Sequence, residues 1–237
     1  MAVIVVTGTG TEIGKTVVTA AIAALARGRG SSVAVVKPAQ TGVAPGDAGD
    51  VDEVVRLAGH VNGVEIARYP EPLAPATAAL RAGMDAVRPR DVVEAVEKLA
   101  TEHDLVLVEG AGGLLVRFDE EGATLADVAG LLRAPVLVVV PAGLGTLNST
   151  TLTAEALRAR RLEQLGVVVG SWPAAPDLAA RCNLVDLPEA AGAPLLGAVP
   201  EGAPALAPAD FRARAASWLA PALGGDWDAE AFTASVR

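Results

Sequence analysis

The feature that most constrains this chain is a glycine-rich loop between two apolar segments near its start. Residues 3–6 are valine and isoleucine, residues 8–16 read GTGTEIGKT, and residues 15–27 have the composition of a helix. Glycine lets backbone N–H groups approach phosphate oxygens closely, and the start of the following helix adds partial positive charge. The sequence therefore predicts a strand, a phosphate-binding loop and a helix in succession.

Two side chains at the end of this loop have defined tasks in such a site. Lys15 would neutralise the β and γ phosphates of a nucleoside triphosphate, and Thr16 would place its hydroxyl on a magnesium ion. The loop is a variant of the common pattern G-x-x-x-x-G-K-[ST], because five residues separate Gly8 from Gly14. An accidental glycine-rich turn is the alternative, but a strand before the loop and a helix after it favour a phosphate site.

Short runs of Val, Ile and Leu recur along the chain and alternate with helix-like stretches rich in Ala, Leu, Glu and Arg. The runs are continuously apolar, as in parallel strands that are covered on both faces. They comprise residues 3–6, 33–36, 105–108, 136–140, 167–169 and 195–199. The helix-like stretches comprise residues 15–27, 90–101, 146–165 and 208–219. This order predicts an α/β fold, a mostly parallel sheet with helices on both faces that resembles the phosphate-loop NTPases.

Domain organisation follows from the same pattern. Prolines interrupt residues 41–89, where we expect loops and short helices. No boundary divides the chain, so we expect one domain over residues 1–237. Residues 221–237, which contain two glycines and Trp227, are expected to form a loosely ordered C-terminal tail without a function of its own.

Composition excludes several partners. The 19 basic and 28 acidic residues give a net charge of −9, which repels a nucleic-acid backbone. The apolar runs are too short to span a bilayer, so we expect no membrane partner. A secretory signal is not indicated, because the first apolar run has no basic segment before it. The single cysteine, Cys182, fits a reducing compartment, and we expect the protein in the cytoplasm.

Acidic residues near strand ends are candidate magnesium ligands. Glu109 follows the apolar run at residues 105–108, where the second acidic motif of nucleotide hydrolases usually stands. A carboxylate at a buried strand end needs a partner or a cation. Asp50 lies in the loop after the second strand, but Asp47 and Asp52 compete with it there, and any of the three could be solvated surface.

Lysine is rare in this chain, with Lys15, Lys37 and Lys98 the three examples. Lys37 ends the second apolar run, which in a parallel sheet places its ammonium group on the ligand side. A compact cation there suits a second anion or a transferring phosphoryl group. The alternative is an ion pair with a neighbouring acid at the sheet edge. Lys98 sits on a predicted helix and is interpreted as surface.

A second glycine-rich turn opens a helix at residues 142–150. Its free amide groups would suit a carboxylate, although ordinary capping by Thr146 or Asn148 explains the same residues equally well. His60 and His103 stand alone and are interpreted as surface histidines.

Five motifs in order resemble the dethiobiotin synthetase family over about residues 1–202. They are residues 7–16 (TGTGTEIGKT), 37–42 (KPAQTG), 73–75 (LAP), 108–116 (VEGAGGLLV) and 145–148 (GTLN). The resemblance implies a homodimeric, magnesium-dependent enzyme of biotin synthesis that inserts CO2 between the two amines of 7,8-diaminononanoate. The amine at carbon 7 forms a carbamate, ATP phosphorylates it, and the second amine closes the ureido ring.

The resemblance also implies roles for individual residues. Catalysis falls to Lys37 and Lys15, and magnesium to Thr16, Asp50 and Glu109. The triphosphate would contact Glu12, Ile13, Gly14, Lys15, Thr16 and Val17. Gly110, Ala111 and Gly112 would lie beside the phosphates and the carbamate. Thr11 and Thr41 would contact the diamine or carbamate, and Leu144, Gly145, Thr146, Leu147 and Asn148 would receive the substrate carboxylate across the dimer interface. The base would lie near Gly170, Ser171, Pro200, Glu201 and Gly202.

One position departs from the family. Many members place an Asn that reads adenine where this chain has Ser171. A single hydroxyl cannot make the two contacts that a side-chain amide makes to a base edge. We therefore expect weak preference among ATP, CTP and other nucleoside triphosphates.

Two other functions compete with the synthetase. A regulatory phosphate-loop ATPase would carry a further lysine at the start of the loop, where this chain has Gly10. An amide ligase of the cobyrinate type would need a glutaminase domain with a nucleophilic cysteine, and Cys182 has no glycine-rich elbow around it.

Overall fold

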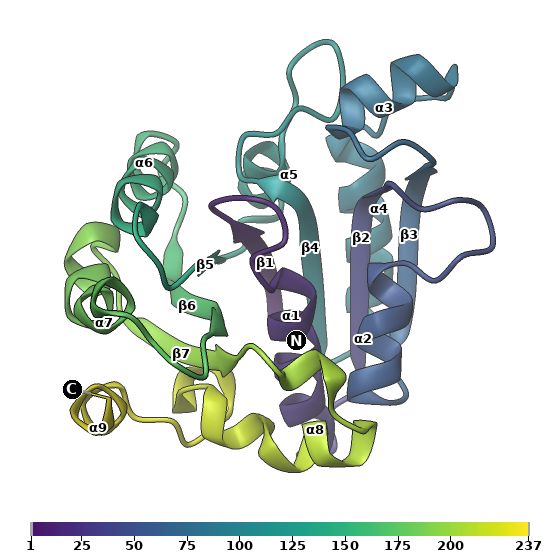
Figure 1. The fold of residues 1–237 in the computed structure, drawn as a ribbon. Coiled ribbons are helices and arrows are strands. Elements are labelled where there is room, and N and C mark those ends of the chain that lie inside the picture. Colours follow the sequence, from purple (N-terminus) through teal and green to yellow (C-terminus); the bar gives the residue numbers. More distant parts are fainter. Residues whose placement is uncertain (1, 237) are drawn as a thin grey trace.

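The computed structural model describes residues 2–236, which form a seven-stranded sheet in the order β3-β2-β4-β1-β5-β6-β7 (Figure 1). All neighbouring strands of this sheet are parallel. The strands are β1 (Ala2–Gly8), β2 (Val33–Thr41), β3 (Asn62–Tyr69), β4 (Leu105–Gly113), β5 (Val136–Val140), β6 (Gln164–Trp172) and β7 (Leu195–Pro200). The predicted α/β class with a parallel sheet is confirmed.

Helices cover both faces of this sheet. They are α1 (Lys15–Gly28), α2 (Asp50–Ala58), α3 (Pro75–Ala82), α4 (Pro89–Ala100), α5 (Leu125–Leu132), α6 (Thr146–Ala159), α7 (Leu178–Ala191), α8 (Pro208–Arg214) and α9 (Ala229–Ser235). Figure 1 shows α1, α2 and α8 on one face and α4 and α5 on the other. Within residues 2–236, no helix has the length and apolar character needed to cross a membrane.

The core sits around β1, which lies between β4 and β5. Val5 is in register with Val108 of β4 and Val136 of β5, and all three side chains are fully buried. Continuous valine suits such strands because both faces of the sheet are covered. Because β1 lies between β4 and β5, the loop after it begins near the middle of the sheet and faces the ends of β2, β4 and β6.

Several elements depart from the sequence prediction. An edge strand, β3, replaces the loop expected within residues 41–89, whereas α2 and α3 are the short helices expected there. This strand was not predicted because it is only half-buried and lacks a continuous apolar run. The helix expected over residues 146–165 ends at Ala159, since Arg161 adopts a left-handed φ of 56° and β6 begins at Gln164.

The helices α5, α7 and α9 were not predicted, and a second helix was predicted too long. The α5 helix has only 8 residues, and α7 contains Pro188, a residue that normally breaks helices. The helix expected over residues 208–219 is α8 followed by a 3-10 turn at Ala215–Trp218.

The C-terminal segment is packed, which corrects the expectation of a loosely ordered tail over residues 221–237 for its described part. Trp227 is buried, and its ring stands 5.4 Å from that of Phe232 in α9. Phe232 in turn makes an edge-to-face contact with Trp172, also at 5.4 Å. Burial of these aromatic rings attaches the segment to the end of β6.

Candidate nucleotide and metal site

The phosphate loop joins β1 to α1 and rests directly on β6. Gly14, immediately before α1, has a left-handed φ of 93°. A Cβ at Gly14 would lie 2.1 Å from the carbonyl oxygen of Gly170, and one at Gly170 would lie 2.0 Å from the carbonyl oxygen of Ile13. The two glycines therefore let two backbones touch, which places Gly170 beside the predicted phosphate loop.

Lys15 is buried along its own loop. Its Nζ donates to the carbonyl oxygen of Gly10 at 2.8 Å. Burial lowers the pKa of Lys15, and repulsion from the nearby Lys37 lowers it further. Thr16 follows, and its hydroxyl donates to Oε1 of Glu109 at 2.9 Å. The loop thus brings the Thr16 hydroxyl to the end of β4, while the Lys15 ammonium group lies on the carbonyl oxygen of Gly10.

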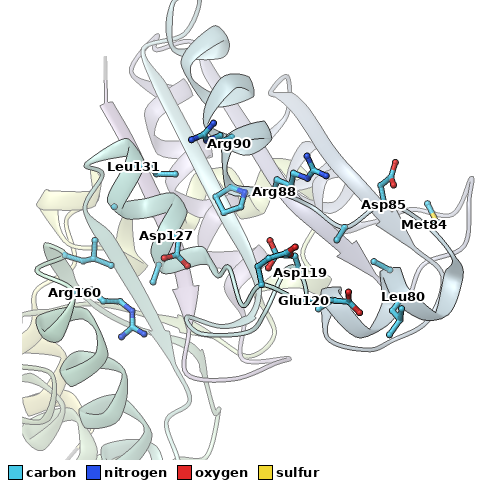
Figure 2. A pocket seen from close by; sticks show the side chains of 18 residues that line it. Leu80, Met84, Asp85, Arg88, Arg90, Asp119, Glu120, Asp127, Leu131 and Arg160 are labelled. Atoms are coloured by element: carbon cyan, nitrogen blue, oxygen red, sulfur yellow. The ribbon is translucent and has the colours of Figure 1, made fainter.

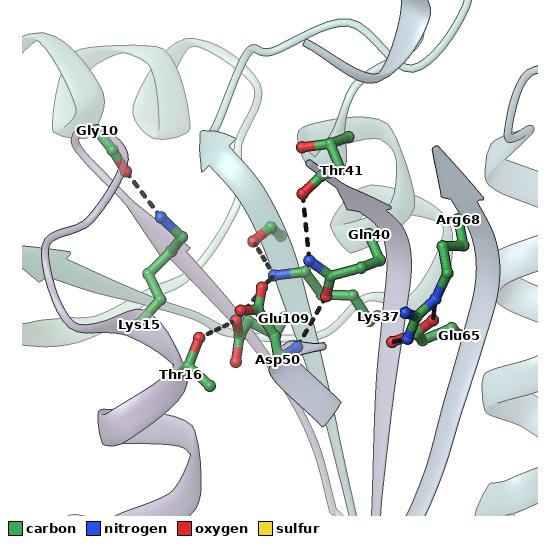
Figure 3. Close-up of polar contacts among 11 residues, drawn as sticks. Gly10, Lys15, Thr16, Lys37, Gln40, Thr41, Asp50, Glu65, Arg68 and Glu109 are labelled. Atoms are coloured by element: carbon green, nitrogen blue, oxygen red, sulfur yellow. Dashed lines mark hydrogen bonds and ion pairs between the residues drawn. The ribbon is translucent and has the colours of Figure 1, made fainter. Parts of the chain in front are cut away.

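Lys37 and Glu109 face each other across β2 and β4 (Figure 3). Val36 is in register with Val108, so the next residue on each strand points the same way. Lys37 Nζ lies 2.9 Å from Glu109 Oε1, donates to the carbonyl oxygen of Gly110 at 3.2 Å, and also pairs with Asp50. The side chains of Lys37 and Glu109 are only 3% and 1% exposed.

Charge outweighs burial at Lys37. Burial favours the neutral amine, but the neighbouring carboxylates of Glu109 and Asp50 raise its pKa above the ordinary value. Lys37 therefore carries a positive charge in the protein. The ion pair with acidic neighbours, which was the alternative for this residue, is present in the structure, and it holds the ammonium group at the ligand side of the sheet.

The residues around Glu109 fit a magnesium ion. Glu109 Oε2 is buried and has no hydrogen-bond partner among the described residues. The Thr16 hydroxyl and the Asp50 carboxylate lie on the same cluster, since Thr16 bonds to Glu109 and Asp50 pairs with Lys37. Carboxylate and hydroxyl oxygens are ligands that hard cations accept. In the part of the chain described, no group of three or more His, Cys, Asp or Glu side chains gathers as a metal site, so two carboxylates and a hydroxyl are the available set.

The structure separates the three aspartates of the loop before α2. Asp50 begins α2 and reaches Lys37. Asp52 instead accepts the backbone N–H of Gly49 at 2.7 Å, which closes the start of the helix. Asp47 contributes its carbonyl oxygen to Arg68 at 2.6 Å. Geometry thus favours Asp50 as the ligand of this loop.

Other predicted residues lie at the same edge of the sheet. Gly112, at the end of β4 beyond Gly110 and Ala111, has a φ of 74°, and a Cβ there would lie 3.7 Å from the Thr11 hydroxyl. Thr41 ends β2, and its carbonyl oxygen accepts from Gln40 at 3.3 Å. The phosphate loop and the ends of β2 and β4 therefore border one site.

The second glycine-rich turn leads into α6. Gly145 stands at the N-cap without a side-chain capping bond, so capping by Thr146 or Asn148 is not observed. The Thr146 hydroxyl is buried and has no partner among the described residues. Leu144, just before it, is 94% exposed. These groups leave the helix start open to an anion.

The residues predicted for the base meet at the ends of β6 and β7. Trp172 is in register with Pro200, and its carbonyl oxygen accepts the N–H of Glu201 at 2.9 Å. Glu201 Oε1 accepts the N–H of Ala174 at 3.0 Å, so this carboxylate holds its own loop. Ser171 is exposed beside them.

Comparisons with known proteins agree with this geometry. A family model described as an AAA domain matches residues 2–208. The ATP-dependent dethiobiotin synthetase of Streptomyces coelicolor is 69% identical over 232 residues, which cover 98% of each chain. That of Saccharopolyspora erythraea is 71% identical and covers 96% of this chain and 99% of the relative. The chain belongs to the ATP-dependent dethiobiotin synthetase family.

Solved structures show the fold of the family more broadly. A ParA family ATPase from Chlorobium tepidum has a TM-score of 0.55 at 15% identity and covers 94% of both chains. The MinC:MinD complex of Aquifex aeolicus gives 0.53 at 16% identity and covers 91% of this chain and 86% of the other. At such identities the likeness shows the phosphate-loop fold alone. The much higher identity to dethiobiotin synthetases favours that function over a regulatory ATPase or an amide ligase.

Sequence reasoning missed two polar residues that touch this site. Gln40 was noted only within the KPAQTG motif, yet its side chain is buried and bonds to the start of α2. Arg68 lies in the unpredicted strand β3 and holds the loop before α2. The amide of Gln40, three residues after Lys37, was visible in the sequence but its burial was not, and only the missing strand could have placed Arg68.

A large cavity lies away from the predicted site. It measures about 1010 Å³ and opens between α3, residues 84–90, residues 119–121 and α5 (Figure 2). None of its lining residues belongs to the predicted nucleotide, metal or substrate groups. Figure 2 shows both acidic and basic side chains around it, among them Arg88 and Asp119.

Proposed function

We propose that this chain is a magnesium-dependent dethiobiotin synthetase that uses a nucleoside triphosphate, CO2 and 7,8-diaminononanoate. The observation that carries the proposal is the buried cluster of Lys37, Asp50 and Glu109 at the end of a phosphate loop. Membership of the dethiobiotin synthetase family supplies the substrate class. A cation held between two carboxylates beside the phosphates suits a reaction in which an anion is phosphorylated.

The proposed reaction proceeds in three bond changes. The amine at carbon 7 attacks CO2 and loses a proton, which gives a carbamate. A carbamate oxygen then attacks the γ-phosphorus and releases the nucleoside diphosphate. The second amine attacks the carbonyl carbon, loses a proton and releases phosphate. Lys37 Nζ stabilises the carbamate and its phosphorylated form, while Lys15 and the backbone of residues 12–17 bind the triphosphate. Thr16, Asp50 and Glu109 would hold magnesium, which neutralises phosphate oxygens when bound.

The substrate carboxylate needs a further anchor. The start of α6 offers free backbone N–H groups and the buried Thr146 hydroxyl. We propose that residues 144–148 of a second copy supply this anchor, which makes the active form a homodimer. The strong exposure of Leu144 supports a contact there. We further propose that the enzyme acts in the cytoplasm.

Product formation tests the function directly. The protein is incubated with magnesium, ATP and bicarbonate, with and without 7,8-diaminononanoate, and phosphate and product mass are followed. We expect phosphate release that depends on the diamine and a product that contains the added carbonyl group. Diamine-independent hydrolysis without a new product would instead indicate a regulatory ATPase.

Base preference is a separate part of the proposal. Because Ser171 offers one exposed hydroxyl, we propose that ATP, CTP and other triphosphates support similar turnover. Steady-state rates with each nucleotide, and with the Ser171→Asn variant, measure this. Wild-type rates should lie within about tenfold of each other, and the variant should favour ATP. Strict use of ATP by the wild type would contradict the proposal.

A further inference from the structure

Gln40 is a buried amide that links two parts of the site (Figure 3). Its side chain is 4% exposed and lies on β2, three residues after Lys37. Oε1 accepts the backbone N–H of Asp50 at 2.9 Å, and Nε2 donates to the carbonyl oxygen of Thr41 at 3.3 Å. One amide therefore joins the first residue of α2 to the end of β2.

The loop before α2 is fixed from its other side by β3. Arg68 bonds to both carboxylate oxygens of Glu65 at 2.8 Å, and it donates to the carbonyl oxygens of Ala44 and Asp47 at 3.2 and 2.6 Å. Arg68 thus connects the edge strand to the loop that ends at Asp50.

Gly49 shows how closely this loop rests on its support. A Cβ at Gly49 would lie 3.0 Å from Gln40 Oε1, 2.7 Å from Glu65 Oε1 and 2.9 Å from Arg68 Nη2. A larger residue at Gly49 would require the ends of these three side chains to move. The backbone at Gly49, immediately before Asp50, therefore lies between the buried amide of Gln40 and the Glu65–Arg68 ion pair.

We propose that Gln40 is a positioning residue, which holds Asp50 beside Lys37 and fixes the backbone of Thr41 at the end of the same strand. This inference rests on the proposed function. Asp50 is 37% exposed, and its backbone N–H is held by Gln40 alone among the described side chains. Loss of that bond lets the first turn of α2 move away from Lys37. Residues behind a metal ligand typically change metal affinity or activity by about 10- to 100-fold.

Gln40→Met tests the role, because methionine keeps the length of the side chain and removes both hydrogen bonds. Mn²⁺ binding in the presence of ATP is measured by electron paramagnetic resonance, without diamine, and KM for the diamine is measured separately. We expect the Mn²⁺ dissociation constant to rise about tenfold and KM for the diamine to rise, with metal-free ATP binding unchanged.

Two further variants separate positioning from folding. Gln164→Met changes a glutamine at the start of β6 whose Nε2 makes no hydrogen bond in the described structure, and it should leave Mn²⁺ binding and KM at wild-type values. Gln40→Glu retains an acceptor for the Asp50 N–H, so it should recover part of the metal affinity but not the KM for the diamine.

The outcomes distinguish this inference from the proposed function. If Gln40→Met lowers the melting temperature and the active fraction, with Mn²⁺ affinity and KM unchanged, Gln40 is only structural and the inference is overturned. The inference is also overturned if Gln40→Met binds Mn²⁺ with wild-type affinity and has a normal melting temperature. A wild-type protein that binds Mn²⁺ with ATP but makes no diamine-dependent product overturns the proposed function, while the Mn²⁺ comparison still decides the role of Gln40.

Discussion

The two halves of the sheet on either side of β1 are built by different means. The half formed by β4, β2 and β3 carries the buried charges, with Lys37 and Glu109 facing each other across two strands. The half formed by β5, β6 and β7 carries no such cluster among its described residues. It meets the phosphate loop through close glycine contacts, and aromatic rings pack the C-terminal segment against the end of β6. Under the proposed function, charge would serve the reaction in one half, and close backbone contact would shape the nucleotide site in the other.

This difference implies different responses to mutation. Removing a charge in the β2 and β4 half should lower the reaction rate most, since the proposed function places those groups beside the reacting atoms. Adding bulk in the β6 half should disturb the loop itself, because two backbones touch there and neither can move cheaply.

The largest effect is expected for Lys37→Met. Product formation should fall by about 10²- to 10³-fold, because the carbamate loses its stabilising cation. The nucleotide dissociation constant should change only a few-fold, since Lys15 and the loop backbone remain. Rates and nucleotide titrations measure the two effects, and Lys98→Met on α4 is the control. A variant that still forms product within tenfold of the wild type would remove Lys37 from the mechanism.

Gly170→Ala probes the other half. The added methyl would lie 2.0 Å from the carbonyl oxygen of Ile13 and 2.5 Å from Val139. We expect a loss of about 3 kcal/mol in the free energy of unfolding, together with weaker nucleotide binding. Gly28→Ala at the end of α1, where a Cβ would have no neighbour within 4 Å, should leave stability unchanged or improve it. Chemical denaturation compares them, and equal stability of both variants would contradict the predicted close packing.

The sequence predicted the charged half better than the packed half. The phosphate loop, Lys37 and Glu109 stand next to apolar runs whose strand ends must meet in a parallel sheet. The same pattern left Asp50 open beside Asp47 and Asp52, and only the resemblance singled it out. Gly170 was predicted near the nucleotide only by resemblance, since no local pattern shows that its backbone lies on Ile13. The strand β3 and the tail around Trp227 were missed, because their stability depends on contacts with distant residues that no periodicity records.

Phe232→Ala tests whether the tail supports the base site. Phe232 is half-buried and contacts both Trp172, beside Ser171, and Trp227. We expect a loss of about 1 to 2 kcal/mol in stability and a higher KM for the nucleotide, with KM for the diamine unchanged. Leu178→Ala, which removes an exposed side chain at the start of α7, is the control. A shift in both KM values alike would show that the tail acts on the whole fold.

The smallest effect is expected at the opposite end of the charged half. Asp104, before β4, accepts the backbone N–H and the hydroxyl of Ser32, both at 2.8 Å, and these two bonds lower its pKa. A carboxyl whose folded pKa is lowered stabilises the protein above its unfolded pKa, and this contribution is lost as pH falls through the folded pKa. The stability gap between wild type and Asp104→Ala should therefore be largest near neutral pH and shrink below about pH 4.

Ser32→Ala and the double variant complete the cycle for this exposed pair. The coupling free energy between the two side chains should be small, because Asp104 is exposed. The substitutions should leave turnover unchanged, since the pair lies at the amino ends of β2 and β4. Urea denaturation at several pH values measures it. If the stability difference between wild type and Asp104→Ala grows on acidification, the folded state favours the protonated carboxyl group of Asp104, which contradicts the prediction. A change in turnover would mean that charge at this end of the strands reaches the reaction, and the assignment of the chemistry to the carboxyl ends would then fail.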